Sequence, residues 1–407
     1  MKRPYLTKHR LGELIEVTRG ASLSGEYYAE EGKLVRLTLG NFDLNGGGFK
    51  LNTSKTDLYF TGPVKENFIL SKGDIITPLT EQTIGLLGAT ARIPESGKYI
   101  QSQDVALIRC KEGLLYPNYC YYLISSKMVR NQLSAAAQQT KIRHTSPDRI
   151  KDCTVCIPSY EEQVRIGDLL VEIDEKINLN KSINHNLEAM AKQLYDYWFV
   201  QFDFPDENGK PYKSSGGKMV WNEKLKREIP GGWEVTNIGS ILDKVFITPR
   251  LSTDEYLPSG TYPIIDQATD VYYAGFTERE EAVVNQYPAI VFGDHSCAVK
   301  YVNFPFVRGA DGTQVILSKD SNIPIEYLYY AMKGVKIGKG YARHFSFLKE
   351  QPVIVPSEKE VKDFEDTAQT FFEQITRNRK EIISLTKQRD ELLPLLMNGQ
   401  VSLNYDL

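Results

Sequence analysis

The sequence lacks several features that would assign it to common classes of protein. No run of about 18 apolar residues occurs, and Met1–Tyr5 lead into Lys8 and Arg10 rather than into the apolar core of a signal peptide. The 407 residues contain only five cysteines, an odd number that fits a reducing compartment better than a disulfide framework. We therefore expect a soluble, cytoplasmic protein.

Familiar catalytic and metal-binding motifs are also missing. Residues 334–340 come nearest to a phosphate-binding loop, but they are one residue short of the pattern and lack the hydroxyl that would hold magnesium. Cys153 and Cys156 have the spacing of metal ligands, yet no second pair of Cys or His accompanies them, so a buried strand is the better interpretation. A dyad based on His144 or His344 would need partners that the sequence does not indicate. We predict neither catalytic residues nor a metal site.

The composition is that of a globular protein with room for two or three domains: 41% of residues are hydrophobic and 25% are charged. The formal net charge is only −3, but residues 1–157 carry 21 basic against 15 acidic side chains. A weakly acidic total therefore does not exclude a nucleic-acid-binding surface on one part of the molecule.

The chain repeats itself. Tyr119–Tyr122 is answered by Tyr327–Tyr330, and from Pro158 and Pro356 onward the two copies align without a gap at an offset of 198 residues. Weaker counterparts join Leu11–Leu14 to Ile238–Ile241, and Arg143-His144 to Arg343-His344. Each half is predicted to be a globular module followed by a segment of about 40 residues, the two halves being related by a pseudo-twofold internal repeat.

Both 40-residue segments are predicted to be long helices. Each begins, after a proline, with the Ser-x-x-Glu pattern of a capping box, at Ser159 and at Ser357. Apolar residues then recur at alternating spacings of four and three, which is typical of a coiled-coil seam. Pro394 should kink the second helix, and Asn398-Gly399 should end it. The two seams can serve each other as an antiparallel pair within one chain.

Asparagines occupy some positions of both seams. In an antiparallel pair, Asn184 is placed to face Asn378 near the centre, forming a polar layer that fixes the register at some cost in stability. The sequence leaves open the alternative that Asn180, Asn184 and Asn378 simply face solvent at a bend.

The modules between the helices are predicted to be mixed α and β. Residues 73–77, 104–110, 289–292 and 313–318 are short stretches rich in β-branched residues and bounded by Gly, Pro or Asp, and they predict strands. Residues 117–133 are more helical, with tyrosines at core positions. We therefore expect an α+β protein with a first module at 1–157, a helical region at 158–204, a linker and second module at 205–357, and a second helical region at 358–407.

Two stretches without acidic residues lie at corresponding places of the two copies, between Glu112 and Asp148 and between Glu326 and Glu350. Basic side chains there would bind phosphates, and Gln, Arg and His could hydrogen-bond to base edges in the major groove. The alternative is a solvated basic face without a partner. The candidate DNA-binding residues are Gln138, Gln139, Thr140, Lys141, Arg143, His144, Lys333, Lys336, Lys339, Arg343 and His344.

The whole pattern resembles the DNA-specificity subunit of Type I restriction-modification systems. The likeness covers essentially the whole chain. It is carried by the two helical segments, by the linker phrases Tyr195–Phe199, Phe202–Pro205 and Gly216–Val220, by the restart Ile229–Glu234, and by the closing Leu392–Gln400. The resemblance implies two target-recognition domains that each read one half of a split DNA target, held apart by two helical regions that set the gap. Recognition residues vary most within this family, so none is carried over.

The resemblance also implies that other chains do the chemistry. Modification (methyltransferase) subunits, two of them, would dock on the helical regions, and restriction subunits would join through the complex. S-adenosylmethionine, ATP and magnesium would be bound by these partners, and this chain would bind no cofactor and would not be an enzyme. A scaffold that uses its coiled coil only to join proteins, without sequence-specific DNA recognition, is the alternative.

Overall fold

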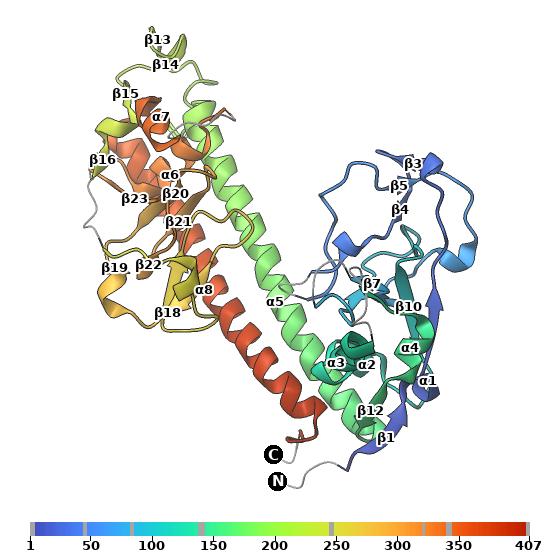
Figure 1. Ribbon diagram of the computed structural model, residues 1–407. Helices are drawn as coiled ribbons and strands as arrows, with labels where there is room; N and C mark the ends of the chain where they lie inside the picture. Colours follow the sequence, from blue (N-terminus) through green and yellow to red (C-terminus); the bar gives the residue numbers. More distant parts are fainter. Residues whose placement is uncertain are drawn as a thin grey trace. The chain divides into compact units, whose positions relative to one another are not determined.

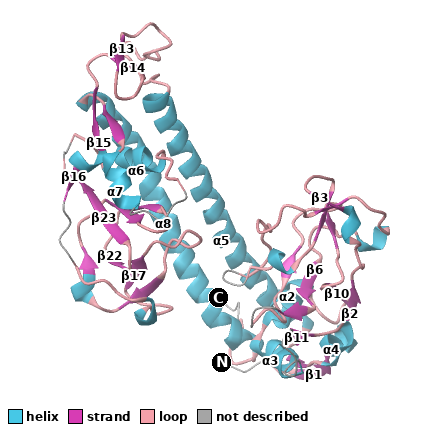
Figure 2. Ribbon diagram, turned by 45° about the horizontal axis from the view of Figure 1, so that its top comes forward, coloured by secondary structure: helices cyan, strands magenta, loops and turns pink. Residues whose placement is uncertain are grey.

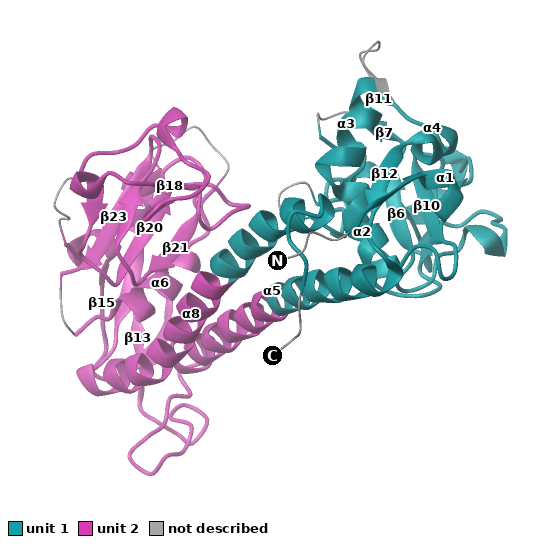
Figure 3. Cartoon of the chain, turned by 90° about the horizontal axis from the view of Figure 1, so that it is seen from below, with its two compact units in different colours: residues 1–178, 382–407 teal, residues 179–381 magenta. Residues whose placement is uncertain are grey.

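The chain divides into two compact units (Figures 1 and 3). A computed structural model describes residues 5–43, 47–81, 85–136, 143–243, 248–319, 322–338 and 344–403. Unit 1 comprises residues 1–178 and 382–407, and unit 2 comprises residues 179–381. Each long helix therefore contributes one part to unit 1 and the other part to unit 2.

Unit 1 is built on two four-stranded sheets, with strand orders β2-β10-β6-β8 and β3-β5-β4-β9, and helices cover the first (Figure 2). Its elements before the first long helix are β1 (Thr7–Arg10), α1 (Leu11–Leu14), β2 (Ile15–Arg19), β3 (Tyr28–Ala29), β4 (Leu34–Arg36), β5 (Tyr59–Phe60), β6 (Ile75–Pro78), β7 (Thr80–Glu81), β8 (Ala91–Arg92), β9 (Tyr99–Ile100), β10 (Val105–Cys110), α2 (Pro117–Ser125), α3 (Lys127–Ala136), β11 (Arg143–His144), α4 (Pro147–Asp152) and β12 (Thr154–Ile157).

Unit 2 repeats this topology, with strand orders β16-β23-β20-β21 and β18-β17-β22-β19. Its elements between the long helices are β13 (Met219–Asn222), β14 (Arg227–Pro230), β15 (Glu234–Asn237), the 3-10 turn Ile238–Ser240, β16 (Leu242–Asp243), β17 (Tyr262–Ile265), β18 (Gly275–Thr277), β19 (Val283–Val284), β20 (Ala289–Gly293), β21 (Val299–Val302), β22 (Phe306–Arg308), β23 (Thr313–Ser318), α6 (Ile325–Lys333), α7 (His344–Glu350) and β24 (Pro352–Val355).

The predicted internal repeat is confirmed at the level of strand pairing. The pair β1–β12 has its counterpart in β15–β24, and the one parallel contact of the second sheet, β4–β9, has its counterpart in β17–β22. A Cβ built on Gly12 would lie 3.0 Å from Cβ of Lys151, and one built on Gly239 would lie 3.0 Å from Cβ of Lys349. The weak likeness between 11–14 and 238–241 therefore marks the same close approach in both modules.

One detail of the predicted repeat is wrong. Arg143-His144 and Arg343-His344 were paired as equivalent positions, but His144 lies in strand β11 and His344 is the first residue of helix α7. The physical reason is a difference in chain length: the glycine contacts align Lys151 with Lys349, an offset of 198, whereas the two histidines are 200 residues apart.

The predicted strands are confirmed as β6, β10, β20 and β23, and each module has a two-sided central strand. In β10, Ala106 and Ile108 pack into one hydrophobic core, and Val105 and Leu107 pack into another. Alternation along a strand places successive side chains on opposite faces, so a run of apolar residues fills both cores. Strand β20 does the same with alternating residues in unit 2.

The helix predicted at 117–133 is two helices, α2 and α3. Ser126 has extended backbone between them, and its hydroxyl donates to the carbonyl of Leu123 at 2.6 Å. The carbonyl of Ser126 then accepts from the amide of Arg130, which starts α3. A serine side chain that competes for backbone groups explains the break.

Both long helices begin where predicted, and the second ends at the predicted Asn398-Gly399. Helix α5 spans Tyr160–Tyr195 and continues into a π-helical turn at Asp196–Val200, and helix α8 spans Glu358–Met397. Helix α8 passes through Pro394 and ends before Gly399, whose φ of +62° is the left-handed conformation that ends many helices. The linker after α5 packs through its aromatic rings, with Phe204 stacked between Tyr212 and Trp233.

The predicted pairing of Asn184 with Asn378 is confirmed. Within unit 2, Nδ2 of Asn378 donates to Oδ1 of Asn184 at 2.8 Å, and both side chains are buried, with 3% and 8% of their surfaces exposed. Asn180 donates to Glu381 and Arg379 pairs with Glu188, so residue numbers rise along α5 as they fall along α8 and the two segments are antiparallel. The alternative that these asparagines face solvent is wrong.

Unit 1 holds its own parts of the helices through charge. Arg389 of α8 pairs with Asp174 of α5 at 2.8 Å, and the hydroxyl of Tyr122 on α2 donates to the same carboxylate at 2.6 Å. Gly167 of α5 lies against α2, where an added Cβ would be 2.6 Å from the amide nitrogen of Tyr119.

Among the helices that the structure describes, none is long and apolar enough to cross a membrane.

Candidate nucleic-acid interface

The acid-free stretch of unit 1 forms α2 and α3 and ends at β11. Its tyrosines are core residues, as predicted, because Tyr119 and Tyr122 are buried between the sheet and α5. Lys127 is exposed on α3. Gln138, Gln139, Thr140 and Lys141 lie outside the described residues.

Arg143 lies beside a buried carboxylate that could not be expected from the sequence pattern. Its guanidinium is 3.6 Å from Oε2 of Glu81, and strand β11 pairs with β7, which carries Glu81. Oε1 of Glu81 accepts from the amide of Leu86 at 2.9 Å and also from the amide of Gly85. A stretch free of acids in the sequence is therefore not free of acids in space.

Arg130 belongs to the same cluster. It donates to the carbonyl of Gly85 at 2.9 Å, and burial lowers the pKa of its guanidinium while the charge of Glu81 opposes that change. Together, Glu81, Arg130 and Arg143 bind Gly85 and Leu86 to helix α3 and strand β11. His144, next to Arg143, is exposed and pairs with Thr80 in the same two-stranded sheet.

In unit 2 the predicted residues fall into two groups. Lys333 ends α6 and donates to the hydroxyl of Tyr329 at 3.0 Å, and Lys336 is exposed just beyond. Lys339 and Arg343 lie outside the described residues. His344 starts α7, and its Nδ1 is 2.6 Å from the carbonyl oxygen of Asp294.

The same edge of the central sheet is used in both units. In unit 2, the carboxylate of Asp294, just after β20, also accepts from the amide of Phe345 at 2.8 Å. In unit 1, the carbonyl of Leu79, just after β6, accepts from the amide of Thr145 at 2.8 Å. The predicted residues Arg143, His144 and His344 therefore lie near the loop after the central strand, where it is bonded to Thr145 before α4 in unit 1 and to the first residues of α7 in unit 2.

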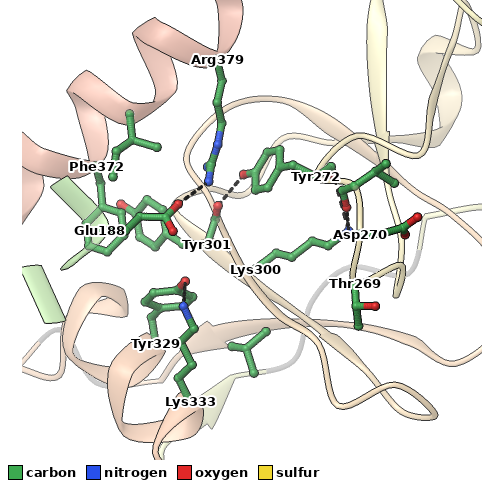
Figure 4. A pocket seen from close by; sticks show the side chains of 13 residues that line it. Glu188, Thr269, Asp270, Tyr272, Lys300, Tyr301, Tyr329, Lys333, Phe372 and Arg379 are labelled. Carbon is green, nitrogen blue, oxygen red and sulfur yellow. Dashed lines mark hydrogen bonds and ion pairs between the residues drawn. The ribbon is translucent and has the colours of Figure 1, made fainter. Parts of the chain in front are cut away.

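Unit 2 also contains a cavity of about 240 Å³ that Lys333 lines, between β21, α6 and the two long helices (Figure 4). Its charged walls are bonded within the protein. Arg379 pairs with Glu188 at 2.8 Å and stacks 3.7 Å from the ring centre of Tyr272, and Lys300 donates to the carbonyl of Val271 at 2.9 Å. Burial lowers the pKa of Lys300. These bonds make the cavity a polar junction in the packing of the module.

Sequence reasoning missed a second cationic group at the sheet edge of unit 2. Arg250 and Arg308 lie close enough that the charge of Arg250, added to burial, lowers the pKa of Arg308. Arg308 donates to the carbonyl of Thr248 at 2.8 Å. These arginines stand far apart in the sequence and outside the acid-free stretches, so counting charges along the chain gives no signal for them.

The described part of the chain contains no group of three or more His, Cys, Asp or Glu side chains suited to an ion. Cys153 immediately precedes strand β12 and is buried, and Cys156 lies within that strand. The predicted strand is therefore present at these two cysteines.

Comparison with known proteins identifies the family. The family model described as "Type I restriction modification DNA specificity domain" matches residues 6–189 and 230–387, one match in each half of the chain. The chain is 26% identical over 317 residues to the Type I restriction enzyme MjaIX specificity subunit of Methanocaldococcus jannaschii, covering 72% of this chain and 70% of the relative. It is 22% identical over 375 residues to the HindI specificity subunit of Haemophilus influenzae, covering 74% and 81%.

A solved structure has the same fold. The crystal structure of the S subunit of a Type I restriction-modification system from M. genitalium aligns over 98% of this chain and 97% of its own, with a TM-score of 0.60 and 19% sequence identity. One conclusion follows from the repeated mixed α and β modules, the two long helices and the two separate matches of the family model. The chain belongs to the family of Type I restriction-modification DNA specificity domains, and it is a specificity subunit with two target-recognition domains.

Proposed function

We propose that each recognition domain of this chain binds one half of a bipartite duplex target, while the helical regions fix the gap and bind modification subunits. In this proposal the recognition domains are residues 1–157 and 205–357, the latter with its linker, and the helical regions are 158–204 and 358–407. The helical regions form an antiparallel coiled coil, and the two halves form a pseudo-twofold internal repeat.

The observation that carries the DNA-binding part is the repeated sheet edge. In each unit, the loop after the central strand is bonded to Thr145 before α4 or to the first residues of α7, and cationic or imidazole side chains gather there: Arg143 and His144 in one unit, Arg250 and His344 in the other. Arginine and histidine present donors to phosphates and to base edges. The remaining candidates, Gln138–Lys141, Lys333, Lys336, Lys339 and Arg343, stay part of the proposal.

Exposed apolar residues on helix α5 support partner docking. Leu179 and Met190 are 60% and 51% exposed. They are 11 residues apart, close to three full turns, so both side chains lie on one face of the helix. Large exposed apolar side chains aligned on one face favour a protein contact. We assign this contact to the modification subunits, of which two would bind, one for each recognition domain.

Catalysis belongs to the partner subunits in this proposal. The family implies a chain that is not an enzyme. The modification and restriction subunits would bind S-adenosylmethionine, ATP and magnesium. The complex would work in the cytoplasm, where the DNA is.

A scaffold without DNA recognition is the competing function, and salt dependence separates the two. Binding of duplex DNA would be measured for the modification subunit alone and for its complex with this chain between 50 and 200 mM salt. Phosphate contacts from this chain make affinity fall steeply with salt, by orders of magnitude for about 6–10 contacts. The proposal expects the complex to bind more tightly and with a steeper salt slope, whereas equal affinity and slope would favour the scaffold.

A further inference from the structure

Loops of unit 2 meet beside the ends of β17, β20 and β22, and together they expose an arginine–aspartate pair. Nη1 of Arg250 is 3.3 Å from Oδ1 of Asp311. The side chain of Gln267 joins the loops: its Nε2 donates to the carbonyl of Asp311 at 2.8 Å, and its Oε1 accepts from the amide of His295 at 3.2 Å. The loop that carries Asp311 is therefore held to the loop after β20 by a bonded framework.

The framework needs unusual backbone. Ala310 and Cys297 have φ values of +31° and +58°, in the left-handed region that side chains disfavour. A Cβ added to Gly309 would lie only 2.1 Å from the hydroxyl oxygen of Tyr256, and Gly312 has a φ of +79°. Strained conformations of this kind persist where the surrounding structure enforces them, and they concentrate at functional sites.

Stability does not account for the pair. The side chains of Arg250 and Asp311 are 49% and 94% exposed, so solvent screens their attraction and the ion pair adds little to folding. The amide of Leu251, the residue after Arg250, donates to the carbonyl of Arg308 at 3.2 Å, which brings a second guanidinium near Arg250, and like charges repel. The backbone here is strained, the ion pair that it exposes is weak, and a like charge lies nearby. Binding of a ligand explains this arrangement better than a contribution to folding does.

The chemistry of the pair selects the ligand. Arginine donates two hydrogen bonds to O6 and N7 of guanine, and a carboxylate accepts from N4 of cytosine, all on the major-groove edge of one G·C base pair. The nearby positive charge of Arg308 favours the approach of phosphates. The same loops carry Asp294, which is bonded to His344, so this surface continues the sheet edge already described.

We propose that Arg250 and Asp311 together read one G·C base pair in the half-site bound by unit 2. The inference rests on the proposed function, since it names the residues that give one recognition domain part of its specificity. Arg250 takes the guanine and Asp311 the cytosine, and the hydrogen bond from Gln267 to the carbonyl of Asp311 holds that loop in place before DNA arrives.

The test compares targets selected from randomised duplex DNA by complexes of this chain with its modification subunit. Arg250→Ala and Asp311→Ala are compared with the unaltered chain and with Arg279→Ala. Arg279 is a matched control, because it is an exposed arginine of the same unit that pairs with Glu255 and Glu281. Both test variants should relax the same G·C position of one half-site, about tenfold or more for Arg250→Ala, and leave the other half-site unchanged.

Two results would overturn the inference. The first is a loss of affinity uniform over all sequences with a salt slope lower by about 1, which would make Arg250 a phosphate contact. The second is an unchanged target in both test variants. Unfolding curves for each complex establish that the variants are folded. If the unaltered complex itself selects no motif, the proposed function fails; if it selects a bipartite motif that the variants leave intact, only this inference fails.

Discussion

Removing one member of the buried asparagine pair should destabilise the protein more than removing both. In Asn378→Ala the 2.8 Å hydrogen bond is lost, and Oδ1 of Asn184 stays buried without that donor. A lost hydrogen bond with one partner left buried costs about 1–3 kcal/mol. Replacing both residues by leucine removes the unpaired group and adds apolar contacts, so Asn184→Leu/Asn378→Leu should be as stable as the unaltered chain or more stable.

Urea unfolding followed by circular dichroism measures these differences, and equal m-values ensure that the transitions are comparable. Ser182→Ala is the matched control, since Ser182 is exposed on the same helix two residues from Asn184. The reasoning predicts a coupling of about 1–3 kcal/mol between the two sites. It would be refuted by an Asn378→Ala variant as stable as the control, or by leucine substitutions whose effects simply add.

Three further predictions concern the length of the long helices, the buried carboxyl of Glu326 and the close approach at Gly167. Seven residues inserted at matching points of α5 and α8 lengthen each helix by about 10 Å and should widen the recognised gap by roughly 3 base pairs; target selection would reveal an unchanged gap if the helices do not set it. Glu326 is buried, burial raises the pKa of its carboxyl above the usual range, and Tyr301 donates to it. Because the folded state raises the pKa of this carboxyl, Glu326 contributes to stability at pH values below the pKa it has in the unfolded chain, and that contribution is lost as pH rises through the folded pKa. Glu326→Gln should therefore stabilise the chain at pH 8 and make no difference at pH 4. Thermal melts at both pH values measure the two effects. Gly167→Ala places a Cβ 2.6 Å from the amide nitrogen of Tyr119 and should cost about 1–3 kcal/mol, while an unchanged melting temperature would mean that α5 can shift without loss.

The parts of the fold that rest on local patterns were predictable. A four-and-three repeat of apolar residues defines one helix face, and that face fixes which residues meet, so even the contact between Asn184 and Asn378 followed from spacing. Central strands such as β10 were visible because a strand buried on both faces is a short apolar run between turns. The break at Ser126 was missed, because a single serine that ends one helix through its hydroxyl and starts the next through its carbonyl leaves the apolar pattern intact.

The candidate site was predictable only in part, because it is assembled from residues distant in sequence. Glu81 neutralises Arg143 across paired strands, and Arg250 meets Asp311 through loops that the sheet brings together. Counting acids along the chain cannot detect either contact, since both depend on the return of the chain through the sheet. The acid-free stretches pointed to the edge of each module where Arg143 and His344 lie, but not to the arginine–aspartate pair in unit 2.

The most direct test of the central claim is selection of targets from randomised duplex DNA by the chain bound to its modification subunit, at near-physiological salt. The account predicts two short motifs separated by a constant gap, one for each recognition domain. Recovery of a single motif, or of none from an intact complex, would contradict it.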